Sequence, residues 1–197
     1  GSKSFVINGD TADKVIVSAR IDGEINDKNG IGLFFVDTNQ ITRRSYNTID
    51  GYRAAELNFD NVNAELLCKN DLALECIIKA NSAGALALSA EAVGIMQVCF
   101  DLTLDYLKTR KQFGKSIGAF QSIQHRMVDM MLEIEQVKSA VMLASSTFET
   151  NSSTRDKNIS AAKNLVGRVG KLIAEESIQL HGGIAMTWEY SVAHYAK

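Results

Sequence analysis

The hydrophobic positions along this chain follow two different periods, and the change falls near residue 70. Before it, short apolar runs are bounded by turn residues, which is typical of β-strands. After it, apolar residues recur every three or four positions, which is typical of amphipathic helices. The pattern predicts a mixed, mainly α protein, with a small antiparallel β-sheet in residues 1–67 and a helical bundle in residues 68–197.

Four runs in the first part are predicted as strands, at residues 5–7, 15–19, 30–37 and 53–59. The turn signal Asn8-Gly9 separates the first two runs, so we expect these to pair with each other. The first run begins almost at residue 1. We therefore expect the sheet to be the remainder of a larger one, with Gly1-Ser2 either native or left from cloning.

The second part is predicted to form four helices, at residues 72–109, 119–149, 159–180 and from about residue 187. A polar turn at residues 150–154 separates the second from the third. The chain has no proline, which fits long uninterrupted helices. Three long helices and a fourth predict an antiparallel four-helix bundle that is cut off at Lys197.

Composition narrows the class of protein. Of the 197 residues 46% are hydrophobic, and the net charge of -2 with no basic block argues against a nucleic-acid surface. No apolar run approaches the ~20 residues that cross a bilayer, so no membrane span is expected. The three cysteines lack CxxC spacing. They predict packing residues in a reducing, cytoplasmic protein without a zinc site.

Two segments could bind a ligand. Arg110-Lys111-Gln112-Phe113-Gly114 offers a guanidinium, an amide and an aromatic ring, which suit a nucleotide-like ligand. The alternative is a solvated basic helix end with Phe113 packed into the core. Gln179-Leu180-His181-Gly182-Gly183 ends a helix in two glycines, which allow backbone to approach a ligand closely. Its alternative is a simple helix C-cap.

Glu91 is the main catalytic candidate. It lies in the first helix on a stripe of small residues that includes Gly84 and Gly94, at helical spacing. Because each helix-interior glycine costs roughly 1 kcal/mol relative to alanine, we expect another helix or a ligand to pack there. The alternative for Glu91 is an ion pair with a nearby lysine or arginine.

The other ionisable side chains are assigned simpler roles. We expect three further glutamates to be solvated or to pair along helices, and two histidines to be structural or to lie at the cofactor edge. These residues are Glu75, Glu133, Glu135, His125 and His181.

Together, Arg110-Lys111-Gln112-Phe113-Gly114-Lys115, Gln121 and the later Gln179-Leu180-His181-Gly182-Gly183 resemble the acyl-CoA dehydrogenase family of flavoproteins. The resemblance covers essentially the whole chain, as the end of the middle β domain plus most of the C-terminal helical domain. It implies that Arg110 contacts the FAD pyrophosphate across a subunit interface, beside Gln112, Phe113 and Gln121. It also implies that Gln179, Gly182 and Gly183 approach the adenosine end from another subunit.

The resemblance is incomplete at the flavin ring and at the base. It implies that Phe5 and Ile7 lie by the flavin ring, but many relatives have tryptophan and threonine there. Many relatives carry the catalytic glutamate after the last helix seen here. Others have it at the position of Gly84, two turns or roughly 10 Å before Glu91.

The function expected from the resemblance is FAD-dependent oxidation of an acyl-CoA to the 2,3-enoyl-CoA, with this chain, as a C-terminal fragment, weakly active or inactive alone. A carboxylate removes the α-proton and the flavin N5 takes the β-hydride. Expected partners are an acyl-CoA, an electron acceptor such as a flavoprotein, and further subunits in a homodimer, homotetramer or hetero-oligomer. The alternatives are a catalytically silent FAD-binding or structural subunit, and a helical interaction module without flavin.

Overall fold

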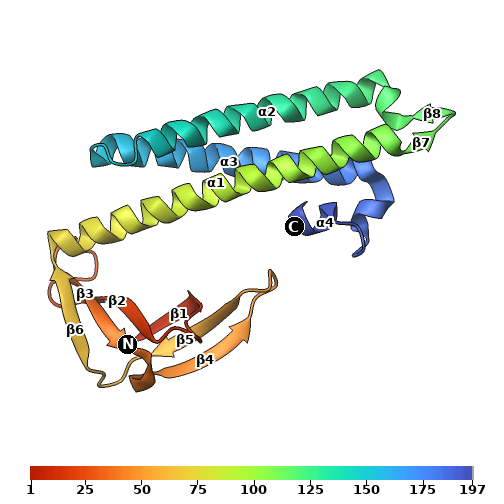
Figure 1. The fold of residues 1–197 in the computed structure, drawn as a ribbon. Coiled ribbons are helices and arrows are strands. Elements are labelled where there is room, and N and C mark those ends of the chain that lie inside the picture. The colour runs from red at the N-terminus through yellow and green to blue at the C-terminus, as the bar shows by residue number, and fades with distance from the viewer. Residues whose placement is uncertain (197) are drawn as a thin grey trace. The chain divides into compact units, whose positions relative to one another are not determined.

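The computed structural model describes residues 1–196, which divide into two compact units, Gly1–Lys79 and Ala80–Lys197. The first unit holds six strands and the second holds the helices (Figure 1). The boundary expected from the sequence, between residues 67 and 68, falls within the last strand of the first unit. The units divide later, inside the long helix α1 (Asp71–Thr109).

The β unit contains two three-stranded antiparallel sheets. Their strands are β1 (Ser2–Ile7), β2 (Lys14–Arg20), β3 (Ile31–Asp37), β4 (Thr42–Asn47), β5 (Arg53–Asn58) and β6 (Ala64–Lys69), with a short 3-10 helix η1 (Thr38–Gln40). One sheet has the order β1-β5-β4 and the other β2-β3-β6. The buried hydrophobic side chains of its strands are small or aliphatic, namely Val36, Ala54, Ala55 and Leu57.

The expected pairing of β1 with β2 is wrong, because β1 pairs with β5 and β2 with β3. The backbone N–H of Asn8 donates to the carbonyl of Arg53, and Asn8 has a φ of 58°. The Asn8-Gly9 turn therefore leads the chain away from β1 instead of folding it back as a hairpin. An ion pair between Asp10 and Arg53 holds this turn against β5.

The strands β4 and β6 were not expected from the sequence. Every residue of β4 except Tyr46 is exposed, and in β6 only Cys68 is half-buried. Neither strand buries one face, so neither shows the alternation of apolar and polar residues that marks a half-buried strand. Both are held by their ladders, β4 to β5 and β6 to β3.

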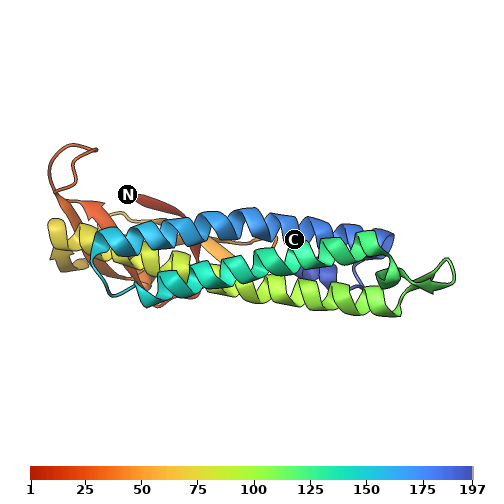
Figure 2. The ribbon, with the colours of Figure 1, turned by 90° about the horizontal axis from the view of Figure 1, so that it is seen from above.

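The helical unit is built from α1, α2 (Gln121–Ser146), α3 (Ser152–His181) and α4 (Val192–Ala196). The first three lie side by side (Figures 1 and 2), and α4 packs on α3. Between α1 and α2 the chain forms a small ribbon, β7 (Lys111–Gln112) and β8 (Lys115–Ser116), then a 3-10 helix η2 (Ile117–Ala119). A second 3-10 helix, η3 (Gly182–Met186), follows α3.

The core of the bundle comes from the apolar stripes of its three long helices. Its members on α2 recur at helical spacing, as Met127, Met130, Ile134, Val137, Val141 and Ala144. Cys99 on α1 belongs to the same core, and burial raises the pKa of its thiol to about 11. The expected packing role of the cysteines is therefore found at Cys99, whereas Cys76 is exposed.

The expected fold class is confirmed, although the starts of two helices lie several residues from where they were expected. α3 begins at Ser152 and not at residue 159, because Asn151 caps it by accepting a hydrogen bond from the backbone N–H of Thr154 at 3.0 Å. The segment expected as a loop is thus the first turn of a helix. α4 begins at Val192 and not near residue 187, since residues 182–186 form η3.

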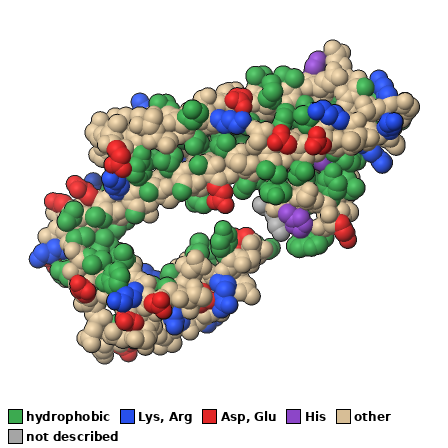
Figure 3. Space-filling model, viewed as in Figure 1, with side chains coloured by type: hydrophobic (Ala, Val, Ile, Leu, Met, Phe, Trp, Pro, Cys, Tyr) green, Lys and Arg blue, Asp and Glu red, His purple; other side chains and the backbone are tan. Residues whose placement is uncertain are grey.

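Exposed apolar side chains occur in both units, and some of them follow one helix of the helical unit. Five of them lie on α2 and are 45 to 71% exposed, namely Val128, Met131, Leu132, Met142 and Leu143. The space-filling view shows hydrophobic side chains interspersed with charged ones along the helices (Figure 3). A face of this kind marks an interaction surface more often than an isolated exposed leucine does.

Within residues 1–196, α1 is the one helix long and apolar enough to cross a bilayer by length and composition. No such run was expected from the sequence. A single helix of this kind is weak evidence, because core helices of soluble proteins meet the same criteria. One side of α1 packs in the bundle core through Met96, Cys99 and Leu107.

Candidate functional site

The Arg110 motif lies where α1 ends and the chain turns back towards α2. The backbone N–H of Arg110 donates to the carbonyl of Tyr106 at 2.8 Å, and the carbonyl of Arg110 accepts from Ile117 N–H at 2.9 Å. The ribbon between these two bonds reverses at Phe113 and Gly114, whose φ angles are 54° and 79°. Arg110 therefore stands at the base of a tight hairpin, which we call the Arg110 hairpin (residues 110–117).

Residues 110–115 of the Arg110 hairpin are exposed, whereas Ile117 at its base packs against the bundle core. Phe113 is 89% exposed, so the alternative of a core aromatic is wrong. Its ring meets Phe120 edge-on at 6.2 Å, and Nζ of Lys115 lies 4.2 Å from the Phe120 ring centroid. Arg110 and Gln112 are exposed as well. Among residues 1–196, Arg110 forms no ion pair, so its guanidinium is available to an anion.

The second motif ends α3. Gly182 has a φ of 70° and its N–H donates to the carbonyl of Ile178, which explains this glycine as the helix C-cap. Gly183 has no such backbone requirement, and within residues 1–196 an added Cβ there would meet no atom within 4 Å. Gln179 is exposed one turn earlier. The cap interpretation therefore accounts for Gly182 but not for Gly183.

Three aromatic rings bring the two motifs to the same end of the bundle. His181 stacks on Tyr106, with ring centroids 4.5 Å apart and planes 27° from parallel. Tyr190 meets His181 edge-on at 5.1 Å and Tyr106 at 6.0 Å. Tyr106 is one turn before Arg110, and His181 directly precedes Gly182. We call these three residues the aromatic cluster.

His181 is deeply buried, with 5% of its surface exposed. Its Nδ1 lies 2.7 Å from the carbonyl oxygen of Ser177, and its Nε2 has no hydrogen-bond partner within residues 1–196. Burial lowers the pKa of His181, and the hydrogen bond to Ser177 opposes this only in part. The ring is therefore best suited to its neutral form, which agrees with the expected structural or cofactor-edge role.

Tyr106 and Tyr190 were missed by the sequence analysis. Tyr106 lies four residues before Arg110, which places it one turn earlier on the same helix. That spacing was a usable signal. Tyr190 had none, because it lies in the irregular segment between η3 and α4.

A cavity of about 390 Å³ lies between the end of α1 and the start of α2. Its lining is mostly apolar, with the side chains of Lys108 and Gln124 among its polar groups. The backbone of Gly118 approaches closely here, since an added Cβ would stand 3.0 Å from the carbonyl oxygen of Leu107. Gln121, the first residue of α2, is exposed and lies two residues from Ala119 and Ile123, which line the cavity. The volume of the cavity lies at the lower end of the roughly 300–1,000 Å³ typical of ligand pockets.

Glu91 lies on the exposed side of α1. Its carboxylate forms no ion pair with any residue between 1 and 196, so the expected alternative of a lysine or arginine partner is not found there. Added Cβ atoms at Gly84 and Gly94 would likewise meet nothing within 4 Å. The small-residue stripe thus leaves open space beside Glu91. Its proposed catalytic role stays a prediction.

The three remaining glutamates have the environments that were expected for them. Glu135 pairs with Lys138 at 2.7 Å along α2, and Glu133 pairs with Arg168 of α3 at 3.0 Å. Glu75 is exposed. These are the solvated and helix-pairing charges expected from the sequence.

Phe5 and Ile7 lie on β1 in the β unit, with 59% and 55% of their surfaces exposed. Phe5 has a φ of 55° at a bulge in the pairing of β1 with β5, and its ring lies 6.5 Å from that of Tyr46. A bulge re-aims side chains away from a regular strand. Both residues are therefore free to contact a ligand, as the resemblance implies.

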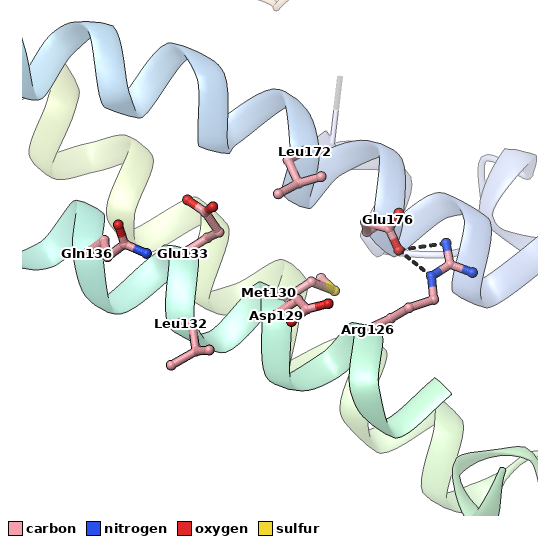
Figure 4. Close-up of a pocket in the computed structure, with 8 residues that line it drawn as sticks. All are labelled: Arg126, Asp129, Met130, Leu132, Glu133, Gln136, Leu172 and Glu176. Atoms are coloured by element: carbon pink, nitrogen blue, oxygen red, sulfur yellow. Dashed lines mark hydrogen bonds and ion pairs between the residues drawn. The ribbon is translucent and has the colours of Figure 1, made fainter. Parts of the chain in front are cut away.

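A separate groove of about 360 Å³ runs between α2 and α3 (Figure 4). Two nitrogens of Arg126 each lie 2.6 Å from Oε2 of Glu176, and the figure shows this pair bridging the two helices. Asp129 and Glu133 lie along the same groove. The groove contains none of the residues expected to hold a cofactor, and its arginine is already paired.

The family model for the acyl-CoA dehydrogenase C-terminal domain matches residues 74–197 of this chain. This chain belongs to the acyl-CoA dehydrogenase family. The match begins at the start of the helical part, and it confirms the resemblance drawn from the two motifs.

Curated family members align along nearly the whole chain. The chain is 33% identical over 194 residues to acyl-CoA dehydrogenase IpdE2 of Mycolicibacterium smegmatis, covering 98% of this chain and 54% of that protein. It is 30% identical over 205 residues to the mitochondrial short/branched chain specific acyl-CoA dehydrogenase of Rattus norvegicus, covering 99% and 46%. The chain thus spans about half the length of the curated relatives it matches.

Solved acyl-CoA dehydrogenases have the same fold. The structure superposes on butyryl-CoA dehydrogenase from Megasphaera elsdenii with a TM-score of 0.89 and 28% identity, covering 100% of this chain and 53% of that one. A glutaryl-coenzyme A dehydrogenase in complex with glutaryl-CoA gives a TM-score of 0.90 at 25% identity, covering 100% and 51%.

Proposed function

We propose that the complete protein oxidises an acyl-CoA to the 2,3-enoyl-CoA with FAD, and that this chain supplies part of the cofactor site and the base. The observation that supports this most is the meeting of the Arg110 hairpin and the Gly182–Gly183 segment at one end of the bundle. Both are exposed, and the aromatic cluster joins them.

The residues present suit a flavin dinucleotide. Arg110 offers an exposed, unpaired guanidinium, which can bind a pyrophosphate through two parallel hydrogen bonds. Gly183 lacks a side chain although neither its backbone nor its neighbours require this, which suits close approach of a ligand from outside. Phe113 offers an aromatic face, and Gln112, Gln121 and Gln179 offer amides.

The two motifs lie together in one chain. This arrangement favours one chain presenting both motifs to the same cofactor, rather than each motif coming from a different subunit. The motif face is open to solvent, so a second chain is needed to enclose the ligand. We therefore propose an oligomer, either a homodimer or homotetramer.

Glu91 is the proposed base within this chain. The flavin, when bound, accepts the β-hydride at N5. The work left to the protein is to hold a carboxylate at the substrate α-carbon and to exclude water from it. Glu91 is an unpaired carboxylate with open space beside it, and nothing between residues 1 and 196 competes for its charge. The complete protein would have to close over this face, because the carboxylate is exposed here.

The electron acceptor and the location belong to the same proposal. We propose a protein acceptor such as an electron-transferring flavoprotein, and a cytoplasmic location with reduced cysteines. Cys68, Cys76 and Cys99 are all free thiols.

A second candidate is a catalytically silent subunit that binds FAD while a different chain supplies the base. Gly84 favours the silent subunit, because some relatives are expected to carry their catalytic glutamate at this position and this chain has glycine there. A solved relative at 29% identity and a TM-score of 0.82 is the Tcur3481-Tcur3483 steroid ACAD, whose name joins two proteins. A hetero-oligomer is therefore the alternative assembly.

Two measurements test the proposal in the complete protein. Purified protein should be yellow with flavin absorbance, and an acyl-CoA substrate should bleach that colour under anaerobic conditions. A colourless protein that takes up no added FAD contradicts both candidates and leaves a helical interaction module. A yellow protein that no acyl-CoA bleaches supports the silent subunit. The isolated 197-residue chain should show weak or no oxidation, because it spans about half of its relatives.

A further inference from the structure

The aromatic cluster connects the two cofactor motifs, because His181 belongs to the second motif and Tyr106 lies one turn before the first. Tyr106 comes from the last turns of α1, His181 ends α3, and Tyr190 comes from the segment before α4. The rings of Tyr106 and His181 are stacked, and the ring of Tyr190 closes against both from the side. Tyr106 thus contacts two rings that lie 75 and 84 residues further along the chain.

We propose that His181 is a positioning residue, which fixes the Arg110 hairpin and the Gly182–Gly183 segment relative to each other so that one cofactor reaches both. The inference rests on the proposed flavin function. His181 contacts no reacting atom in this role. It acts through Tyr106 on one side and through its own backbone on the other.

The hydrogen bond of His181 orients its ring. A carbonyl oxygen can only accept, so the 2.7 Å contact with Ser177 requires a proton on Nδ1. The remaining nitrogen, Nε2, is buried and has no partner within residues 1–196, which disfavours a second proton there. The imidazole is therefore held as a single neutral tautomer, with its face against Tyr106.

The stack then connects the two motifs by short paths. The backbone carbonyl of Tyr106 accepts a hydrogen bond from the N–H of Arg110 at 2.8 Å, so a shift of Tyr106 moves the last hydrogen bond before the hairpin. On the other side, His181 is bonded covalently to Gly182, whose N–H donates to Ile178. Loss of the stacked ring should therefore loosen both segments together. Loss of an ordinary core residue elsewhere on α3 should loosen neither.

Amide hydrogen exchange on the flavin-free complete protein tests the connection without requiring activity. His181→Leu removes the stacked ring and keeps the site apolar, and it should raise exchange about tenfold or more at both the Arg110 and the Gly182 amides. His181→Phe keeps a ring against Tyr106, and it should hold both amides within about threefold of the parent. Ile159→Ala is the matched control, because Ile159 is buried at the far end of the same helix.

Particular results would overturn the proposal. Faster exchange at Gly182 alone in His181→Leu would mean that His181 supports only its own helix end. Failure of His181→Phe to restore protection at Arg110 would exclude the stacked ring as the link. A similar rise at both amides in Ile159→Ala would mean that any loss of core packing has the same effect.

Flavin affinity is the second measurement. The FAD dissociation constant should rise about tenfold or more in His181→Leu and stay within about threefold in His181→Phe and Ile159→Ala. An unchanged constant in His181→Leu overturns the positioning role. A parent protein that binds no FAD contradicts the proposed function, and the exchange result then still decides whether His181 joins the two segments.

Discussion

Arg110 and Glu91 are the two side chains on which the proposed chemistry depends, and both are exposed and unpaired within residues 1–196. An exposed charge that no neighbour satisfies contributes little to folding. Substituting either residue should therefore affect ligand binding or turnover far more than stability. This separation makes each a clean test of function.

Arg110→Ala should weaken FAD binding in the complete protein. A charge-assisted pair that becomes buried on binding contributes about 2 kcal/mol, so the FAD dissociation constant should rise about 30-fold. Arg110→Lys keeps the charge but loses the planar fork, and it should give an intermediate constant. Equilibrium titration of flavin-free protein with FAD measures the dissociation constants of the parent and of the two variants. An Ala variant that binds FAD as tightly as the parent would remove Arg110 from the site.

Glu91→Gln should leave FAD bound and the fold intact, because glutamine has the same shape. Substrate-dependent bleaching of the flavin should fall about 100-fold or more, as expected for loss of a general base. The ascending limb of the pH profile should disappear as well. Stopped-flow absorbance at the flavin band measures both effects. Bleaching near the parent rate would move the base outside this chain.

Because His181 is buried, we expect the stability of the folded protein to depend on pH. Burial lowers the pKa of His181 in the folded state below its ordinary value near 6.5. Below about pH 6.5 the imidazole binds a proton more readily in the unfolded chain than in the folded one. The folded state should therefore lose stability as the pH falls from about 6.5 towards the lower pKa of the folded state. The titratable groups packed against the ring are Tyr106 and Tyr190, and burial raises the pKa of Tyr190 above its ordinary value.

Thermal unfolding at pH 7.5 and 5.5 measures this effect against a control. The parent should lose more stability between the two pH values than His181→Phe, since the variant has no group to titrate at this site. Equal losses in both proteins would mean that the buried imidazole is not protonated differently on unfolding.

The candidate site was partly accessible from sequence at this scale. Arg110 and Gly183 could be named as candidates from the order of residue types alone, because each motif is continuous. That Phe113 points outward and that Tyr106 meets His181 depend on which way side chains turn and on contacts 75 residues apart in sequence. Such contacts are set by packing, which one sequence without an alignment does not reveal.

Helices were predicted better than strands because each long helix carries its own repeating stripe. The limits of α1 agree with expectation to within one residue. β4 and β6 were missed because strands of this kind are held by ladders to partners far away in sequence, not by a local pattern. The pairing of β1 with β5, rather than with the adjacent β2, has the same origin.

Asn151 provides a test at the level of a single helix. Its side chain accepts a hydrogen bond from the Thr154 N–H at the start of α3. Asn151→Ala should therefore lower the free energy of unfolding by about 1 kcal/mol. Asn151→Ser should keep most of this contribution, because serine can also cap a helix. Urea unfolding followed by circular dichroism measures the difference. An Ala variant as stable as the Ser variant would show that the cap is not needed.

The whole molecule adds a requirement that neither motif shows alone. The cavity near the Arg110 hairpin is about 390 Å³, and the motif side chains around it are exposed. A dinucleotide bound to this chain alone would stay largely in water, and cofactors held tightly have most of their surface buried. The exposed apolar stripe on α2 is suited to a protein partner.

Flavin retention should therefore depend on assembly. On serial dilution of the complete protein, loss of the oligomer and release of FAD should occur over the same concentration range, because each stabilises the other by mass action. Added FAD should shift dissociation of the oligomer to lower protein concentrations. Analytical ultracentrifugation with detection at the flavin band reports both events in one experiment.

Met142→Glu would place a charge on the α2 stripe, whereas Lys171→Glu changes an exposed charge on α3 as the control. If the Met142→Glu protein is monomeric yet keeps its full complement of FAD, one chain is enough to hold the cofactor and the shared site is wrong.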